Sequence, residues 1–168
     1  NLNNVEFSFE KKLLGTAGAV KKINTNNKIK TLIIIYGDTI SKLKLKSVIK
    51  FHYKQNSNFT IVSNKSYKTL NSGVLEINSK KILQNLYEKK IKQTNKSRWV
   101  NSGIYIIEKK ILNKIDKSHY DFSNNFIPDL LKKNIKIYVY KSRARFLTID
   151  SKKLLFKSRK ALESKKIN

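Results

Sequence analysis

Thr31-Leu-Ile-Ile-Ile-Tyr-Gly-Asp38 is the stretch of this 168-residue chain that decides its fold. The run is apolar on both faces of a strand instead of alternating, which is typical of a buried parallel strand. Gly37 ends the run and Asp38 places a carboxylate directly after it. Ligands of open α/β sheets collect at the carboxyl ends of the strands. We therefore expect the chemistry to begin at Asp38, where a carboxylate suits Mg²⁺, although Gly-Asp is also ordinary turn chemistry.

Helical and strand patterns alternate on both sides of this stretch. The alternation predicts an α/β fold with a Rossmann-like mixed, mostly parallel sheet and helices on both faces, in a single domain over residues 1–168. We expect helices at 14–24, 43–56, 108–115 and 122–133, the last bent or interrupted by a 3₁₀ segment at Pro128. We expect strands at 59–62, 73–77, 82–88, 100–107, 135–140 and 146–149, and a final helix capped by Ser151.

The composition gives a strong charge signal that has two explanations. The net charge of +26 is typical of proteins that bind nucleic acid or an anionic membrane surface. Only four of the 37 basic residues are arginine, the side chain that phosphate and base-edge recognition favours, and the lysines are spread along the whole chain. Lys, Asn and Ile have A/T-rich codons, so an A/T-rich genome is the second explanation of the charge. On that explanation most lysines are solvated surface residues that carry little function.

Other features of the composition exclude several classes of protein. The chain has no cysteine, so disulfides and thiolate metal sites are absent. No apolar run approaches the ~20 residues of a membrane span, and no signal peptide opens the chain. We therefore expect a cytoplasmic protein without a membrane partner. The chain also lacks methionine, even at position 1, so we expect a processed or fragmentary start.

Three more motifs are weak when taken singly. Leu14-Gly-Thr-Ala-Gly-Ala19 would let backbone N–H groups approach an anion at a helix start, or form a plain loop. Glu88-Lys-Lys90 would place a lysine on a phosphate, or lie solvated in a lysine-rich chain. Asn101-Ser-Gly103 offers a donor and an acceptor to sugar hydroxyls, or a turn that begins a strand. His52 lies on an apolar helix stripe and is expected to be a core or boundary residue and not a ligand.

The order of the motifs is more specific than any one of them. It runs Glu10-x-x-Leu-Leu-Gly-Thr-Ala-Gly-Ala-Val20, Ile33-Ile-Ile-Tyr-Gly-Asp38, His52 before Phe59-Thr-Ile61, Ser72-Gly-Val-Leu-Glu-Ile77, Leu86-Tyr-Glu-Lys-Lys90, Val100-Asn-Ser-Gly-Ile-Tyr-Ile106 and Phe122 to Leu131. This order resembles the sugar-1-phosphate nucleotidyltransferase family, the NDP-sugar pyrophosphorylases, from about residue 10 to about residue 161. It looks nearest to the D-glycero-D-manno-heptose 1-phosphate guanylyltransferases and to the related mannose- and glucose-1-phosphate enzymes.

The resemblance implies a reaction and its participants. A sugar 1-phosphate oxygen attacks the α-phosphorus of a nucleoside triphosphate, pyrophosphate leaves, and Mg²⁺ neutralises charge. The product would be an NDP-sugar, such as GDP-heptose or GDP-mannose made from GTP. Such a product would serve the synthesis of lipopolysaccharide or capsule. The resemblance is also compatible with a homo-oligomer. The matching positions are Gly15, Thr16, Ala17 and Gly18 for the nucleotide, catalytic Asp38 for Mg²⁺, catalytic Lys89 for the sugar phosphate, and Gly73, Glu88, Asn101 and Gly103 for the sugar.

This sequence departs from the family pattern in two places that matter. The family opens with a strand and a glycine-rich loop ending in Thr-Arg, so we expect an N-terminally truncated domain that lacks roughly 60 residues, at ~30 per strand–helix unit. Near the C-terminus, Thr148 stands where the second metal aspartate is expected. Asp150 falls two residues on, which is the same side of a strand, and is the candidate substitute.

These departures leave three functional hypotheses. The first is a nucleotidyltransferase that is inactive as this truncated chain. The second is a non-catalytic module that binds sugar phosphate or a nucleotide sugar. The third, which the arginine count disfavours, is a basic nucleic-acid-binding protein.

Overall fold

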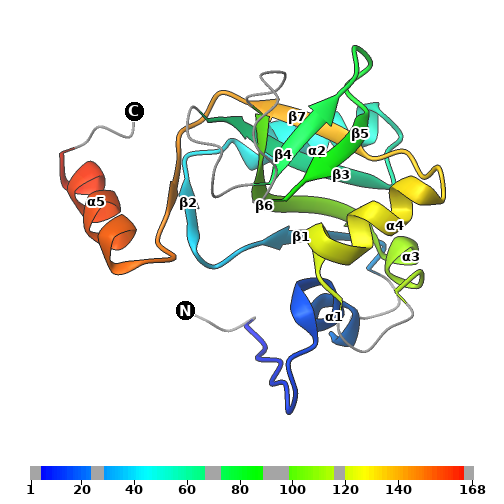
Figure 1. Ribbon diagram of the computed structural model, residues 1–168, viewed down its shortest axis with the longest axis horizontal. Coiled ribbons are helices and arrows are strands. Elements are labelled where there is room, and N and C mark those ends of the chain that lie inside the picture. Colours follow the sequence, from blue (N-terminus) through cyan, green and yellow to red (C-terminus); the bar gives the residue numbers. More distant parts are fainter. Residues whose placement is uncertain (1–4, 24–28, 67–72, 89–98, 116–119, 165–168) are drawn as a thin grey trace.

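The computed structural model describes residues 5–23, 29–66, 73–88, 99–115 and 120–164 (Figure 1). Its helices are α1 Gly15–Lys22, α2 Leu45–Lys54, α3 Lys109–Leu112, the π-helix η1 Phe122–Phe126, α4 Ile127–Lys132 and α5 Lys152–Glu163. Its strands are β1 Thr31–Ile35, β2 Thr39–Ser41, β3 Phe59–Lys65, β4 Val74–Ile77, β5 Leu83–Tyr87, β6 Trp99–Glu108, β7 Tyr138–Ser142 and β8 Phe146–Thr148.

Strand β6 is the centre of a six-stranded sheet. The strand order is β5-β4-β6-β3-β7, and β1 also pairs with β6. Strand β3 lies along one edge of β6, while β4 and β1 share the other. A second, two-stranded sheet pairs β2 with β8 and is followed by α5. The main sheet therefore carries the core, and the small sheet and α5 form an appendage at one side of it (Figure 1).

Alternating side chains of β6 build the core on both faces of the sheet. Tyr105 and Ile107 join the larger cluster, which includes buried residues of α1, α3, η1 and α4. Ile104 and Ile106 join the smaller cluster, with Val48 of α2. Figure 1 accordingly shows α4 in front of the sheet and α2 behind it. Because successive strand residues point to opposite faces, a strand covered on both sides reads as one unbroken apolar run.

The expected mixed α/β fold with helices on both faces is confirmed. The sheet was predicted to be mostly parallel, however, and most of its strand pairs are antiparallel. Among the described strands only β3 and β7 pair in parallel. Strands β4 and β5 are joined by a short turn in which Asn78 Oδ1 accepts a hydrogen bond from Ile82 N at 2.9 Å. So short a connection permits only an antiparallel pair, since parallel strands need a crossover of about a dozen residues.

Several local predictions also need correction. Residues 31–36 were predicted to form a buried parallel strand, but β1 pairs with β6 in antiparallel fashion, and Ile33 and Ile35 are 41% and 54% exposed. Strand β2 was not foreseen, because its three residues carry no periodicity of their own. Helix α3 has four residues and β7 begins at Tyr138, so both are shorter than expected. The predicted helix at 122–133 is divided into the π-helix η1 and α4, and Pro128 does not mark a 3₁₀ segment. It lies in the first turn of α4, where its missing N–H has no helical partner to lose.

The C-terminal helix begins as predicted, because Ser151 Oγ accepts a hydrogen bond from Leu154 N at 3.3 Å. No helix within the described residues is both long enough and apolar enough to cross a membrane.

His52 is buried in the core, as its place on an apolar helix stripe predicted. Its side chain is fully covered, with Nδ1 2.8 Å from Thr60 Oγ1 and Nε2 3.4 Å from Glu108 Oε1. Burial lowers the pKa of His52, and the hydrogen bond to Glu108 opposes only part of that effect. The folded protein therefore holds this imidazole neutral at a pH where the unfolded chain begins to protonate it.

The depressed pKa of His52 predicts a pH dependence of stability. Between the folded pKa and the unfolded value of 6.5, the unfolded state binds more protons, so the free energy of unfolding falls as pH drops through this window. We expect the thermal midpoint to decrease between pH 7.5 and 5.5 and the His52→Gln variant to lose most of that slope. Calorimetry at matched ionic strength measures it, and equal slopes for both proteins would contradict the assignment.

Candidate functional site

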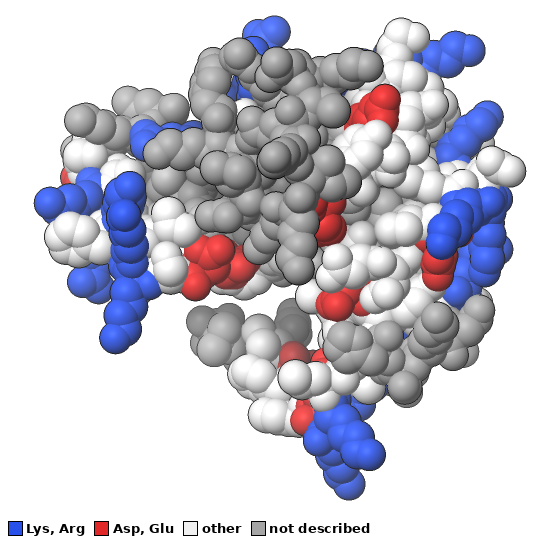
Figure 2. All heavy atoms as spheres, in the orientation of Figure 1, with Lys and Arg blue, Asp and Glu red and all other residues white. Residues whose placement is uncertain are grey.

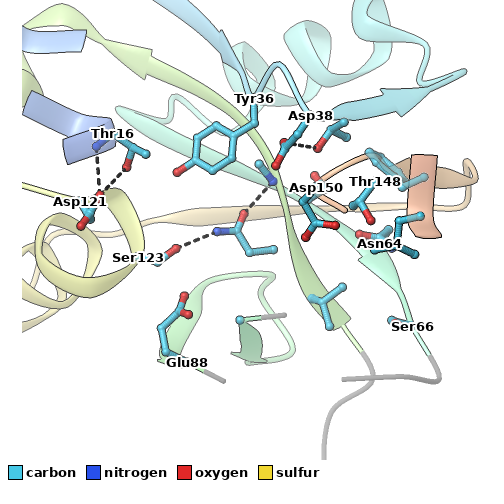
Figure 3. A pocket seen from close by; sticks show the side chains of 18 of the residues that line it. Thr16, Tyr36, Asp38, Asn64, Ser66, Glu88, Asp121, Ser123, Thr148 and Asp150 are labelled. Carbon is cyan, nitrogen blue, oxygen red and sulfur yellow. Dashed lines mark hydrogen bonds between the residues drawn. The ribbon is translucent and has the colours of Figure 1, made fainter. Parts of the chain in front are cut away.

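A pocket of about 690 Å³ opens where β4 and β1 separate along their shared edge of β6. Figure 3 shows side chains from α1, the β1–β2 turn, β3, β6 and the η1 region facing it. The described lining residues are Thr16, Tyr36, Asp38, Thr39, Asn64, Ser66, Gly73, Glu88, Val100, Asn101, Ser102, Gly103, Asp121, Ser123, Asn124, Phe146, Thr148, Asp150 and Leu154.

The separation of β4 from β1 is a fork that begins at Asn101 and ends at Gly103. Asn101 N donates to Gly73 O at 2.8 Å on the β4 side, and Tyr36 N donates to Gly103 O at 3.0 Å on the β1 side. Between the partners of Ile61 and Ser63 in β3, strand β6 carries a bulge. Three residues predicted to contact the sugar, Gly73, Asn101 and Gly103, therefore meet at the mouth of this fork.

The side chain of Asn101 stabilises the fork by hydrogen bonds to Tyr105, Ser123 and Gly103. Its Nδ2 donates to Tyr105 Oη at 2.8 Å and to Ser123 Oγ at 3.2 Å, and its Oδ1 accepts from Gly103 N at 3.1 Å. The prediction that Asn101 offers a donor to a sugar hydroxyl is not met here, because both amide hydrogens have protein acceptors. The second lone pair of Oδ1 is the part of this side chain that is left for a ligand.

Glycine is required at position 103 by the backbone conformation there and by the nearby ring of Tyr36. Its φ is +71°, and a Cβ built there would lie 2.9 Å from ring carbons of Tyr36. An L side chain would thus be strained in conformation and would also strike an aromatic ring that is itself packed against Tyr105. Glycine at this position lets β1 approach β6 again beyond the bulge.

The two candidate metal carboxylates lie on the wall formed by the small sheet. Strands β2 and β8 pair Thr39 with Thr148, and the ladder continues as Ile149 N donates to Asp38 O at 2.9 Å. Asp38 and Asp150 both line the pocket as a result. Figure 3 shows them on adjacent segments, next to β2 and β8. Thr148, which occupies the sequence position expected for an aspartate, lines the same wall.

Carboxylate oxygens suit a hard cation, so Asp38 and Asp150 fit Mg²⁺ in kind. No group of three or more His, Cys, Asp or Glu residues within the described ranges is placed to hold a metal. A Mg²⁺ ion here would take its other ligands from water and phosphate oxygens, as this ion usually does in proteins.

The predicted nucleotide loop is anchored to the protein by its own amides. Gly15 has φ +73°, and a Cβ there would lie 2.8 Å from the backbone of Tyr120. Ala17 N and Gly18 N each donate to Tyr120 O at 2.9 Å, and Thr16 N donates to an Asp121 carboxylate oxygen at 3.0 Å. These three N–H groups are not free for a ligand, which differs from the prediction. Of the four loop residues, only Thr16 lines the pocket.

Glu88 lines the pocket opposite the small sheet, close to Gly73. A Cβ on Gly73 would lie 3.0 Å from Glu88 Oε1, so the absence of a side chain leaves room for that carboxylate. Lys89, predicted on the sugar phosphate, lies outside the described residues.

Sequence reasoning missed several pocket residues, among them Tyr36, Asp121 and Ser123. Burial raises the pKa of the Tyr36 hydroxyl, and the hydrogen bonds to Thr16 and Tyr105 offset part of that rise. No local signal marks any of the three, because each acquires its role from a segment distant in sequence.

The charge of the pocket is opposite to that of the chain. Four of the chain's 11 acidic residues line it, namely Asp38, Glu88, Asp121 and Asp150, whereas no Lys or Arg of the described residues does. Figure 2 shows Lys and Arg mostly at the outer margins of this face. The described part of the lining therefore repels bare anions at close range unless a cation accompanies them.

Comparison with known proteins gives consistent results. The family model described as Nucleotidyl transferase matches residues 1–145. A Sulfolobus acidocaldarius protein that carries the name mannose-1-phosphate guanyltransferase is 29% identical over 147 residues, 87% of this chain and 40% of its own length. A Synechocystis UTP–glucose-1-phosphate uridylyltransferase is 28% identical over 76% of this chain and 34% of its own length.

The structural comparison agrees with the sequence matches. The structure of HddC from Yersinia pseudotuberculosis complexed with GMP-PN superposes with a TM-score of 0.76 at 25% identity, over 91% of this chain and 64% of that one. This chain thus spans less than two thirds of the length of each of these relatives.

The fork predicts a large cost for a side chain at position 103. We expect Gly103→Ala to lower the free energy of unfolding by about 2–4 kcal/mol, from positive-φ strain and the contact with Tyr36. Gly37→Ala is the matched control, since a Cβ there meets nothing within 4 Å, and we expect a change within about 0.5 kcal/mol. Urea unfolding measures both, and equal stabilities of the two variants would refute the fork geometry.

Proposed function

This chain belongs to the nucleotidyl transferase family, and from that premise we propose that its pocket binds a sugar 1-phosphate for nucleotidyl transfer from a nucleoside triphosphate. The products would be an NDP-sugar, of the GDP-heptose or GDP-mannose type, and pyrophosphate. The observation that carries the proposal is the joining of Asp38 and Asp150 on one wall of a pocket whose other walls present Glu88 and the Asn101–Gly103 fork. The named relatives that act on mannose and glucose 1-phosphates support this class of substrate.

In the proposed reaction an oxygen of the sugar 1-phosphate forms a bond to the α-phosphorus of the triphosphate, and the bond from that phosphorus to the pyrophosphate oxygen breaks. No covalent bond to the protein forms, so the chain's task is to position and to compensate charge. Mg²⁺, when bound, would neutralise phosphate oxygens. Asp38 and Asp150 would hold it, and Glu88 would accept hydrogen bonds from sugar hydroxyls.

The acidic lining predicts that the sugar 1-phosphate needs Mg²⁺ in order to bind. Because no Lys or Arg of the described lining faces a phosphate, we expect mannose 1-phosphate to bind only when Mg²⁺ is present. Isothermal titration with Mg²⁺ and with EDTA measures this. Equal affinity under both conditions would show that cations outside the described lining hold the phosphate, and would remove the metal from the binding step.

The two wall aspartates are expected to act together. Asp38→Asn and Asp150→Asn each remove one charged oxygen ligand, so we expect at least about a 10-fold loss of Mg²⁺-dependent affinity. Glu163→Gln on α5 makes the same change of net charge outside the pocket lining and is expected to leave affinity unchanged. A loss in the control equal to that in the two aspartate variants would mean that overall charge, and not the wall, governs binding.

Turnover separates an enzyme from a binding module. Pyrophosphate release is measured with mannose 1-phosphate and each of GTP, UTP, CTP and dTTP. Release with one triphosphate, lost in Asp38→Asn, supports nucleotidyl transfer and identifies the base. Binding without release for any triphosphate, also when the family's opening strand and glycine-rich loop are fused before residue 1, supports a sugar-phosphate-binding role for the chain.

A further inference from the structure

Helix α1 begins without a capping residue of its own. Leu14 precedes it and makes no side-chain capping bond, and the first turn contains no acidic residue. Because the first N–H groups of a helix have no partner within the helix, their acceptors have to come from elsewhere. Asp121 Oδ1 accepts from Thr16 N at 3.0 Å, across 105 residues of sequence, and Tyr120 O accepts from the next two N–H groups. Helix α1 is therefore capped by a distant segment.

Asp121 caps α1 instead of the helix that it precedes. An aspartate just before a helix usually accepts from the N–H groups of that helix. The side chain of Asp121 makes no such bond to η1. Its Oδ1 accepts from Thr16 N and also from Thr16 Oγ1, the latter at 3.3 Å. The carboxylate thus lies at the positive end of the α1 dipole, where a negative charge is favoured.

The Thr16 side chain makes the matching bond in the opposite direction. Its Oγ1 accepts a hydrogen bond from Phe122 N at 3.0 Å while it donates to Asp121 Oδ1. The hydrogen and one lone pair of this hydroxyl are therefore assigned, which fixes the threonine side chain from both sides. The three hydrogen bonds that join Thr16 to Asp121 and Phe122 are called the Thr16 clasp below.

The Thr16 clasp lies on the pocket wall away from the two candidate metal carboxylates. Thr16 and Asp121 both line the pocket. Figure 3 shows them together on one side of Tyr36, with Asp38 and Asp150 on the other side. The acidic lining therefore contains carboxylates in two different settings, one pair on the small-sheet wall and one carboxylate bound to the start of α1.

We propose that Asp121 is a positioning residue that caps α1 and holds Thr16 on the pocket wall, and that it acts by accepting hydrogen bonds and not by binding Mg²⁺. This inference rests on the proposed function, because the ligand that this wall would receive is the sugar 1-phosphate with its Mg²⁺. A wall that is fixed before the ligand arrives lowers the ordering cost of binding. The proposal separates Asp121 from Asp38 and Asp150, whose expected role depends on their negative charge.

Asparagine at position 121 distinguishes the two roles, because it keeps an oxygen acceptor suited to capping and removes the charge. We expect Asp121→Ala to bind mannose 1-phosphate in saturating Mg²⁺ about 5-fold more weakly, the effect of losing one or two hydrogen bonds. Asp121→Asn should recover most of that affinity, in contrast to Asp38→Asn. A loss in Asp121→Asn as large as in Asp121→Ala would show that the charge matters and would overturn the proposal, as would an Asp121→Ala variant that binds like the parent chain.

Thr16 supplies a second pair of variants, which decides the question if alanine at position 121 disturbs folding. Thr16→Val removes the hydroxyl and should weaken binding as Asp121→Ala does, whereas Thr16→Ser keeps the hydroxyl and should retain most of the affinity. Thr31→Val is the matched control, because Thr31 Oγ1 donates to a Glu108 carboxylate oxygen at 2.6 Å and neither residue belongs to the described pocket lining. Equal affinities of Thr16→Val and Thr31→Val would contradict the proposal.

Amide hydrogen exchange tests the Thr16 clasp without any ligand. In Asp121→Ala, Thr16 N loses its acceptor, and Phe122 N faces a threonine hydroxyl that is no longer held. We expect exchange at both amides to be about 3-fold faster or more, and Asp121→Asn to stay close to the parent rates. Faster exchange at only one of the two amides, or at neither, would overturn the positioning role. If the parent chain binds no sugar 1-phosphate, the proposed function fails, and the exchange result still decides whether Asp121 holds Thr16.

Discussion

The pocket depends on one backbone constraint, which is that a single edge of β6 has to serve two strands. Strand β4 takes the first part of that edge and β1 takes the last part, and the change of partner falls between Asn101 and Gly103. A bulge and a positive φ at Gly103 make the change possible. The fork thereby separates the pocket wall that carries Glu88 from the wall that carries Asp38.

The charge pattern of the chain and the charge of its pocket have separate causes. Lysines spread over the surface contribute to a net charge of +26. Their fields are screened over about 8 Å at physiological ionic strength. Four carboxylates, in contrast, line the pocket. The described lining of the pocket therefore favours cations although the net charge of the chain is positive, so net charge alone would have suggested an unsuitable partner.

The sequence predicted the features that depend on local pattern and missed those that depend on long-range pairing. Residues 31–36 correctly predicted a strand but not its surroundings, since Ile33 and Ile35 of β1 are 41% and 54% exposed. The stripe through His52 correctly predicted a helix packed on the sheet, because that signal lies within one element. Strand β2 exists only because β8 returns to pair with it, and η1 packs in the larger cluster beside α1. The directions of the sheet pairs likewise depend on which strands become neighbours, which no window of sequence contains.

The same difference between local pattern and long-range pairing explains which residues of the candidate site were predicted from the sequence and which were missed. Gly73, Asn101 and Gly103 were recognised by the order of the motifs, and the structure brings them together at the fork. Tyr36 and Asp121 carry no motif. The place of Tyr36 follows from its backbone hydrogen bond to Gly103 O, and that of Asp121 from its hydrogen bonds with Thr16. The amides of Thr16, Ala17 and Gly18 looked available in sequence, yet the carbonyl of Tyr120 and the carboxylate of Asp121 occupy them. Satisfying buried backbone donors took precedence over presenting them to a ligand.

Asp150 shows why a site is better compared by position in space than by position in a motif. Strand β8 pairs Thr148 with Thr39, and Ile149 N then bonds to Asp38 O. Since extended residues alternate between faces, Thr148 and Asp150 share one face and both reach the pocket. A shift of one residue would have turned the carboxylate away from Asp38, whereas a shift of two keeps it on the same wall. The loss of aspartate at Thr148 therefore changes the motif without removing the second carboxylate from the pocket.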